Sequence, residues 1–271
     1  MVILLLQGCA LLNAAQLTPE ALRAWDAYVR VAKEHLEDRA RSHGPFLWVD
    51  DRPDLLHRVQ AGEIVIEPVR GGSPHAVPGA LIHDWIGVVF IPKTNLYEVM
   101  GVLSEFDRYK DFYGPMVVKS KLLAQAPDHA KISLMLVQKA FSITGAVETE
   151  NQVDFATLGA DRAYSLSTSI RVQEIADYGT PSQHPFAEGS GPGYVWRTFN
   201  ITQLEQRDGG VFTQIEIIIM SRTIPLALRW LIQPVAEHLA RNALLATLQE
   251  TRDAVTRETK TAGLKTRTVP H

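Results

Sequence analysis

Cysteine is almost absent from the chain, since only one occurs among 271 residues. A disulfide framework, a zinc site built from several thiolates and an iron–sulfur cluster all need more sulfur, so the sequence excludes them. An excess of positive charge is missing as well: 27 lysines and arginines face 30 aspartates and glutamates, for a formal net charge of -3. Such a chain has no general positive field that gathers a phosphate backbone, and we expect no nucleic-acid partner.

The chain also lacks the short motifs that mark common catalytic sites. It contains no G-x-S-x-G elbow, no H-E-x-x-H zinc motif, no P-loop and no G-x-G-x-x-G between a strand and a helix. Its nine histidines are scattered, and no two are spaced as a metal site on a helix requires. We therefore predict no catalytic residue, no metal site and no cofactor, and expect any function to depend on a cavity.

The N-terminus, residues 1–15, is apolar and uncharged and is followed by the polar segment 16–20. It is too short to span a bilayer and resembles the apolar part of a secretory signal, although a basic segment before it is missing. The letters NAA at 13–15 offer a signal-peptidase site, and LQGC at 6–9 loosely resembles a lipoprotein box in which Cys9 is acylated. We expect export, with a periplasmic or secreted protein. The alternative is a buried helix with Cys9 in the core.

Hydrophobic periodicity predicts two helices and a strand in residues 16–79. Thr18 followed by Pro19 is typical of a helix N-terminus, and apolar residues then recur every three or four positions up to Leu36. A helix over 18–41 is therefore predicted to have one apolar face. A short helix over 53–59 and a strand over 63–67 complete this N-terminal layer.

From residue 80 onward the pattern becomes regular. Segment 81–91 is predicted to be a buried strand, Asn95 caps a helix that continues to 103, and a short helical piece follows at 107–113. Runs rich in β-branched and aromatic residues come next, and short polar turns join most of them, which predicts an antiparallel meander with a long loop at 177–193. The strands are expected at 116–124, 130–140, 142–155, 162–175, 194–206 and 211–222.

The last element is predicted to be a long helix that begins at Pro225 and ends near Val255. Its apolar residues fall on two faces, and Pro234 is expected to kink the helix between them. The two sets are Leu228, Leu231, Val235 and Leu239, and then Leu244, Leu248 and Val255. A helix that is apolar on two sides must be covered on two sides. We therefore expect one face to pack on the sheet and the other under the 18–41 helix.

Five strings of residues carry a resemblance to a known group of proteins. They are HDWIGVVFIP at 83–92, EFDRYKDFYGPMVVKSKLL at 105–123, VETEN at 147–151, RDGGVFTQIEIIIMSRTIP at 207–225 and WLIQPVAEHLARNALLATLQETRDAV near the end. They resemble the START-like superfamily, the polyketide cyclase and lipid transport (SRPBCC) group with the helix-grip fold, in its bacterial exported form. The pattern departs from that group at Asn151, where a histidine is expected, and at Thr223, where an aspartate often stands.

The resemblance implies an α+β helix-grip fold, with a curved antiparallel sheet wrapped around the long C-terminal helix and an extra N-terminal helical layer. Together with the patterns above, it divides the chain into a signal peptide at 1–15, a helical extension and strand at 16–79, a START-like domain at 80–258 and a disordered tail at 259–271. The superfamily includes lipid carriers, hormone receptors, allergens and a few enzymes, so the fold does not name an activity.

We expect the chain to bind or transport a hydrophobic small molecule or lipid in an internal cavity between the sheet and the C-terminal helix, rather than to catalyse a reaction. Transient contact with a membrane is a further expectation. The alternative is an enzyme of the cyclase, aromatase or hydrolase type that uses polar residues of the same cavity. The polar candidates are Tyr113, Arg197, Glu216 and Arg222, but the sequence offers no nucleophile with an activating neighbour.

The cavity wall is expected to draw on two regions. The resemblance places segment 107–113 at the cavity mouth, and the first candidates are Trp85, Tyr109, Phe112 and Tyr113. In the last hairpin, the turn at 208–209 pairs positions placed symmetrically on its two sides, which sorts the side chains into two faces. The face that mixes charged with bulky residues supplies the second candidates: Arg197, Phe199, Glu216, Ile218, Met220 and Arg222. The alternative is that this face meets solvent and the isoleucine face, Ile215, Ile217 and Ile219, is plain core.

If the N-terminus is a secretory signal, the mature chain begins at Gln16. N-terminal sequencing of the protein recovered from the envelope fraction checks this. An intact Met1 on a cytosolic protein would contradict it.

Overall fold

A long antiparallel sheet organises the chain in the computed structural model, which describes residues 16–42, 44–140, 143–224 and 226–267. The helices are α2 (Pro19–Arg41), α3 (Pro53–Gln60), α4 (Leu96–Ser104), α5 (Tyr109–Phe112) and α6 (Leu226–Arg267). The strands are β1 (Val65–Pro68), β2 (His75–Val77), β3 (Ala80–Pro92), β4 (Val117–Gln125), β5 (His129–Ala140), β6 (Ile143–Leu158), β7 (Arg162–Ala176), β8 (His184–Pro185), β9 (Arg197–Arg207) and β10 (Gly210–Arg222). The predicted signal at 1–15 lies outside the described residues.

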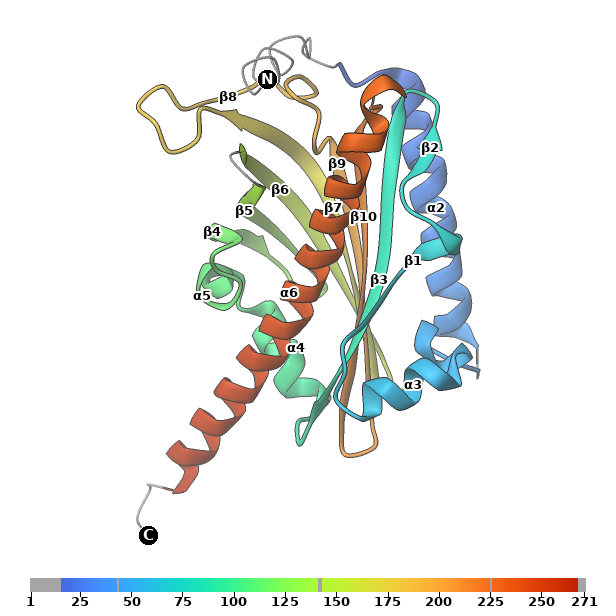
Figure 1. Ribbon diagram of the computed structural model, residues 1–271. Helices are drawn as coiled ribbons and strands as arrows, with labels where there is room; N and C mark the ends of the chain where they lie inside the picture. Colours follow the sequence, from blue (N-terminus) through green and yellow to red (C-terminus); the bar gives the residue numbers. More distant parts are fainter. Residues whose placement is uncertain (1–15, 43, 141–142, 225, 268–271) are drawn as a thin grey trace.

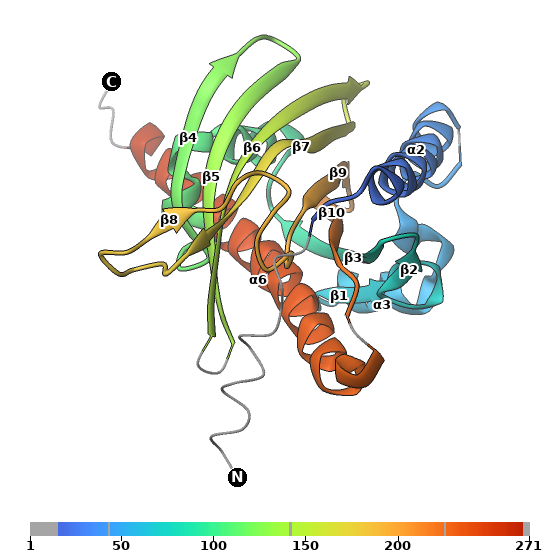
Figure 2. The same ribbon diagram turned by 90° about the horizontal axis from the view of Figure 1, so that it is seen from above.

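The strands follow the order β1-β3-β10-β9-β7-β6-β5-β4, with β2 on β3 and β8 on β7. The predicted meander is confirmed, because β4 to β7, β9 and β10 pair in chain order. The first strand of the domain, β3, then lies beside the last, β10. The sheet curves, and α6 crosses its concave side (Figures 1 and 2). This is the α+β helix-grip arrangement that the sequence predicted, a curved antiparallel sheet with a long C-terminal helix on its concave side.

The turn between β9 and β10 sets the register of the strands that carry most of the core. Asp208 and Gly209 have φ values of 56° and 77°, and two successive residues with positive φ form the turn that matches the twist of a hairpin. The pairing runs without a shift from Arg207 and Gly210 to Arg197 and Met220. The structure therefore confirms the pairing that the sequence predicted, and with it the two sets of side chains.

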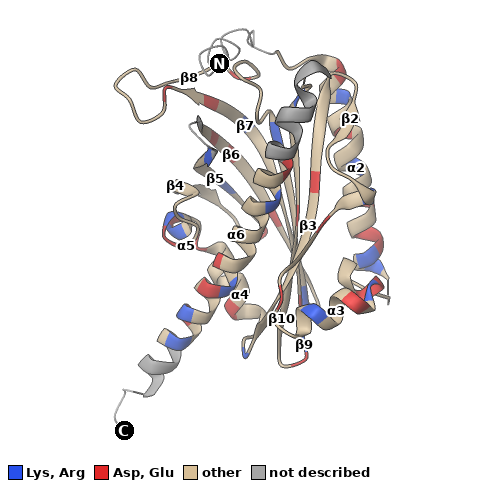
Figure 3. Cartoon of the chain, in the orientation of Figure 1, with Lys and Arg blue, Asp and Glu red and all other residues tan. Residues whose placement is uncertain are grey.

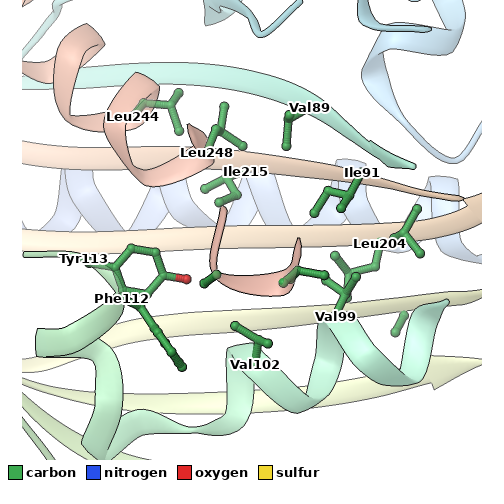
Figure 4. Packing of buried hydrophobic residues seen from close by; sticks show 14 of the residues in the cluster. Val89, Ile91, Val99, Val102, Phe112, Tyr113, Leu204, Ile215, Leu244 and Leu248 are labelled. Atoms are coloured by element: carbon green, nitrogen blue, oxygen red, sulfur yellow. The ribbon is translucent and has the colours of Figure 1, made fainter. Parts of the chain in front are cut away.

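Helix α6 covers the concave face of the sheet. Its buried residues Leu244, Leu248 and Val255 belong to one hydrophobic cluster with residues of β3, β9, β10, α4 and α5 (Figure 4). Gly87 on β3 permits the close approach of the helix. A Cβ atom at Gly87 would lie 2.6 Å from Cδ1 of Leu248 and 3.2 Å from Cδ2 of Leu244.

Helix α2 covers the convex face, on the opposite side of the sheet from α6. Thr18 caps it by accepting a hydrogen bond from the backbone N–H of Ala21, at 3.2 Å, as its position before Pro19 predicted. The buried face of α2, which includes Trp25 and Leu36, shares a cluster with residues of β3, β9 and β10. The sequence-based prediction that α2 and α6 pack together is therefore wrong, because the sheet lies between them (Figure 1).

Helix α6 is also longer than the sequence predicted. It continues to Arg267, through most of the segment expected as a disordered tail. Once a helix is nucleated, each added residue gains a backbone hydrogen bond, and the polar residues after Val255 hold no proline before that point. The side chains of 225–236, which include Pro234 and three residues of the predicted first apolar face, Leu228, Leu231 and Val235, lie outside the described residues. The fourth, Leu239, is half-buried. No helix in the described part of the chain is both long and apolar enough to cross a membrane.

The contact at Gly87 yields a test of how α6 is seated. Gly87→Ala is expected to lower the free energy of unfolding by about 1–3 kcal/mol, because the added methyl group overlaps Leu248. Gly101→Ala, at an exposed position of helix α4, is the matched control, since a methyl group there would have no atom within 4 Å, and it should be neutral or stabilise by up to about 1 kcal/mol. Urea unfolding of both variants measures the difference, and equal effects would contradict the close packing.

Candidate functional site

The concave face of the sheet carries a band of small polar side chains. One row across the paired strands runs from Val153 on β6 through Ser167 on β7 and Asn200 on β9 to Ile217 on β10 and Trp85 on β3. In the neighbouring rows, too, the residues on β7 and β9 carry hydroxyl or amide groups. The band consists of Thr149, Asn151, Ser165, Ser167, Ser169, Thr198, Asn200 and Thr202.

Several members of this band are only half-buried, including Ser165, Ser167, Asn200 and Thr202, although they lie on the side of the sheet that α6 covers. The isoleucines beside them on β10, Ile217 and Ile219, are half-buried as well. Closely packed core side chains are normally fully buried. This part of the concave face is therefore less tightly covered than the cluster around Leu248, where α6 seals the sheet.

The charges of these strands lie on the opposite, convex face. Glu150 on β6 accepts from Lys131 on β5 at 2.6 Å and from Arg171 on β7 at 3.0 Å, which forms a network on that side. More widely, charged residues gather on α2, α3 and the later part of α6, and the strands are mostly uncharged (Figure 3). The alternation of side chains along each strand thus separates a charged face from an uncharged one.

One carboxylate at the edge of the concave face already accepts several hydrogen bonds from the backbone. Glu174 on β7 accepts hydrogen bonds from the backbone N–H groups of Gly193, Tyr194 and Val195, at 2.7, 2.6 and 3.2 Å. These contacts tie the 177–193 loop to the sheet. Glu174 therefore has a structural role at the entrance to β9 and adds no free charge to the band.

The aromatic residues expected at a cavity mouth lie on the α6 side. Phe112 and Tyr113 are buried in the cluster that contains Leu248, and the hydroxyl of Tyr113 is 3.1 Å from Oγ1 of Thr251 on α6 (Figure 4). Tyr109 donates to the backbone carbonyl of Leu103 at 2.6 Å. Burial raises the pKa of Tyr113 to about 12 and that of Tyr109 well above its usual value, so both stay protonated. Their role as a gate stays a prediction.

Four buried polar atoms on the α6 side have no hydrogen-bond partner among the described residues. They are Nε1 of Trp85, Oγ1 of Thr213, Nδ1 of His83 and Oε2 of Glu250 on α6 itself. The other ring nitrogen of His83 lies 2.9 Å from Oγ of Ser221, and burial lowers the pKa of this histidine to about 4. Buried donors without partners are uncommon and costly, and those of Trp85 and Thr213 lie where a bound molecule could satisfy them.

The structure divides the residues predicted to line one cavity. Trp85, Tyr109, Phe112 and Tyr113 lie on the concave side with α6. The other predicted residues, Arg197, Phe199, Glu216, Ile218, Met220 and Arg222, share the convex face that α2 covers. The expectation that this second set faces the C-terminal helix is wrong. The hairpin register separates two faces correctly, but it does not say which helix covers each.

Most of the second set has a structural role in α2 docking and in the loop before β9. Phe199, Ile218 and Met220 are completely buried against α2. Arg197 pairs with Glu188 at 3.5 Å and donates to the backbone carbonyl of Trp196 at 2.9 Å. Arg222 donates to the carbonyl of Pro192 at 3.4 Å. Since Tyr113 lies across the sheet from Arg197, Glu216 and Arg222, the four polar candidates for catalysis do not form one site.

The remaining member, Glu216, belongs to an acidic pair that the sequence analysis missed. It lies on β10 diagonally across from Asp84 on β3, and Tyr28 of α2 donates to Oδ2 of Asp84 at 2.7 Å. Burial, followed by the charge of Asp84, raises the pKa of Glu216 to about 8, and burial raises the pKa of Asp84 to about 6. A charged residue inside the apolar run 81–91 was the signal available in the sequence.

The chemistry available for metals and cofactors is limited in the part of the chain that the structure describes. No group of three or more histidine, cysteine, aspartate or glutamate side chains there is arranged to hold a metal ion. His83 and Ser221 form a buried pair, but Nδ1 of His83 has no orienting partner in the same described residues. The site is therefore better suited to binding than to nucleophilic chemistry.

In comparisons with known proteins, no family model matches the chain and no curated protein matches its sequence. Several solved structures are similar to the chain in fold. A STAR-related lipid transfer protein from Xanthomonas axonopodis is 14% identical, with 70% of this chain and 98% of that chain covered and a TM-score of 0.49. The Zhui aromatase/cyclase from Streptomyces sp. R1128 is 11% identical over 67% and 98%, with a TM-score of 0.46. Human STARD10 is 10% identical over 83% and 87%, with a TM-score of 0.44. At these identities the similarity concerns the fold alone.

The acidic pair predicts a pH-dependent stability. The pKa of Glu216 is about 8 in the folded chain against 4.5 for the free group, so the folded state holds the proton more tightly. The stability that this proton provides is present below about pH 4.5 and is lost as the pH rises to about 8, by a few kcal/mol at most. Urea unfolding at intervals from pH 5 to 8 measures the slope. Glu216→Gln should flatten it to the smaller contribution of Asp84, and parallel curves would contradict the assignment.

Proposed function

We propose that the chain binds an uncharged, largely apolar small molecule, a lipid among them, between the concave face of the sheet and α6. The observation that carries the proposal is the half-buried, uncharged band centred on Ser167 and Asn200, flanked by Ile217 and Trp85. Binding sites for hydrophobic ligands are lined mainly by apolar and aromatic groups, with a few polar groups that fix orientation. The START-like fold is compatible with this use.

The charge distribution favours a ligand without a strongly charged head group. A buried charge is costly unless a counter-charge or several hydrogen bonds accompany it. Along the concave face of the described strands β6, β7, β9 and β10, Glu174 is the charged residue, and three backbone N–H groups already saturate it. Hydroxyl and amide groups such as Ser167 and Asn200 can instead bind a carbonyl, hydroxyl or ester group of the ligand.

An enzyme of the hydrolase or cyclase type is the second candidate, and the His83–Ser221 contact of 2.9 Å is the observation that favours it. A serine beside a neutral histidine can be activated for attack on an ester. The pair ranks second, because Nδ1 of His83 lacks an orienting group among the described residues. Turnover of a p-nitrophenyl ester that is lost in Ser221→Ala would place catalysis on this pair. Transient membrane contact and export remain proposals beside both functions.

Two neighbouring residues on β7 provide the test of the binding proposal. Ser167→Phe fills the concave face, whereas Thr168→Phe places the same side chain on the convex face, and both positions are half-buried. For the uncharged probe N-phenyl-1-naphthylamine, Ser167→Phe is expected to raise the Kd by about tenfold or more, and Thr168→Phe to leave it nearly unchanged. Fluorescence titration measures both values, and native mass spectrometry shows any retained lipid. Equal Kd values for the two variants would contradict the proposal.

A further inference from the structure

A second hollow lies on the convex face, between the later part of α2, segment 44–51 and the 3-10 turn Val69–Gly71. Its volume is about 580 Å³. The paired strands β3, β10 and β9 form its floor, where Ile86 and Ile201 lie directly across from Glu216 on either side. The walls include Leu36, Trp48 and Val69. The floor and walls of the hollow therefore include apolar groups, and Glu216 is the carboxyl on its floor.

Other polar groups on the floor are already satisfied by the protein. Gln214 donates to Gln203 at 2.7 Å and accepts from the backbone N–H of Trp48 at 2.8 Å. Gln203 in turn donates to the carbonyl of Phe46 at 2.9 Å. These hydrogen bonds hold segment 44–51 against the floor at this end of the hollow. They leave Glu216 as the polar group on the floor with capacity for a ligand.

The carboxyl of Glu216 interacts with charged neighbours of both signs. Among the described residues, the carboxyl of Asp84 raises its pKa and the guanidinium of Arg70 lowers it. Arg70 itself lies over the ring of Tyr28, with Cζ 4.6 Å from the ring centroid. Asp84 is 1% exposed, and its Oδ1 has no hydrogen-bond partner in the described chain. The carboxyls of Asp84 and Glu216 therefore lie close together, and an added cation would offset the repulsion between them.

The hollow is lined by acidic and basic side chains together. Asp38, Asp51 and Glu216 line it together with two arginines, Arg39 and Arg70. Arg39 is committed to Asp51 and to backbone carbonyl groups of segment 45–47, so it offers no free donor pair to an incoming anion. Once Glu216 is ionised, a cation in the hollow would meet a complementary charge on the floor, whereas an anion would be repelled by it.

We propose that this hollow is a binding site for a small organic ammonium ion with a short apolar body. The ammonium group donates to the carboxylate of Glu216, and the apolar body lies against Ile86, Ile201 and Leu36. A charge-assisted hydrogen bond of this kind is stronger than a neutral one. The site lies across the sheet from the band around Ser167, so it is independent of the function proposed above.

Isothermal titration calorimetry with hexylammonium tests the proposal, with hexanol and hexanoate as probes of the same body and a different head group. Hexylammonium is expected to bind about tenfold or more tightly than hexanol, and hexanoate more weakly still. Because binding requires ionised Glu216, titrations at pH 7 in two buffers of different ionisation enthalpy should show proton release. Equal binding of hexylammonium and hexanol, tighter binding of hexanoate, or no binding of hexylammonium would each overturn the proposal.

Two variants with the same glutamate-to-glutamine change distinguish an effect at the floor of the hollow from an effect elsewhere on the convex face. Glu216→Gln is expected to weaken hexylammonium binding about tenfold or more, whereas Glu150→Gln, on the same face of β6 outside the hollow, should leave it unchanged. A loss in both variants, or in neither, would overturn the assignment.

The pH dependence of the wild-type chain gives a second measurement that needs no variant. The titratable and charged groups around Glu216 are Tyr28, His35, Asp38 and Arg39 on α2, Asp84 on β3, Asp51 after α2 and Arg70 on the turn. The affinity for hexylammonium is expected to rise from pH 6 to pH 8, as Glu216 gives up its proton, and to level off above that. An affinity that does not change over this range would contradict binding through Glu216.

Discussion

Strand β3 is buried on both of its faces, and the rest of the structure depends on this constraint. Eleven of its thirteen residues are buried, so the alternation of side chains sends apolar groups to both sides of the sheet. Trp85 and Val89 meet α6, and Ile82 meets α2. A strand with two apolar faces needs cover from two layers, which accounts for a helix on each side of the sheet. Gly87 sets how closely α6 approaches.

The two helices create two different environments on one sheet. Beneath α6 the strands offer hydroxyl, amide and apolar groups, and the nearby carboxylate of Glu174 is saturated by backbone N–H groups. Beneath α2 the sheet holds Asp84 and Glu216, where burial raises the pKa of both carboxyls and the charge of Asp84 raises that of Glu216 further. The uncharged side suits an apolar ligand and the acidic side suits a cation. The sheet between them keeps the two kinds of binding physically separate.

Local patterns in the sequence were sufficient for the elements and for much of the pairing. Thr18 and Asn95 mark helix starts because their side chains accept hydrogen bonds from backbone N–H groups of the first turn, a contact that needs no tertiary structure. Asp208-Gly209 fixes the last hairpin because two residues with positive φ favour one turn type. The sequence likewise sorted the hairpin residues into two faces, and it indicated the order of strands and the C-terminal helix.

The sequence by itself determined which side chains share a face, and the tertiary structure decided what each face meets. Periodicity of two along a strand is a local property, so Glu216, Ile218 and Met220 could be grouped without coordinates. Whether α2 or α6 covers that group depends on the path of segments far apart in the chain, since both helices carry apolar residues that can pack on a sheet. The pairing of Asp84 with Glu216 also needed the β3–β10 contact, which joins residues more than a hundred positions apart. Local sequence patterns do not predict such contacts, because the energy of the contact arises only once β3 and β10 are paired in the folded sheet.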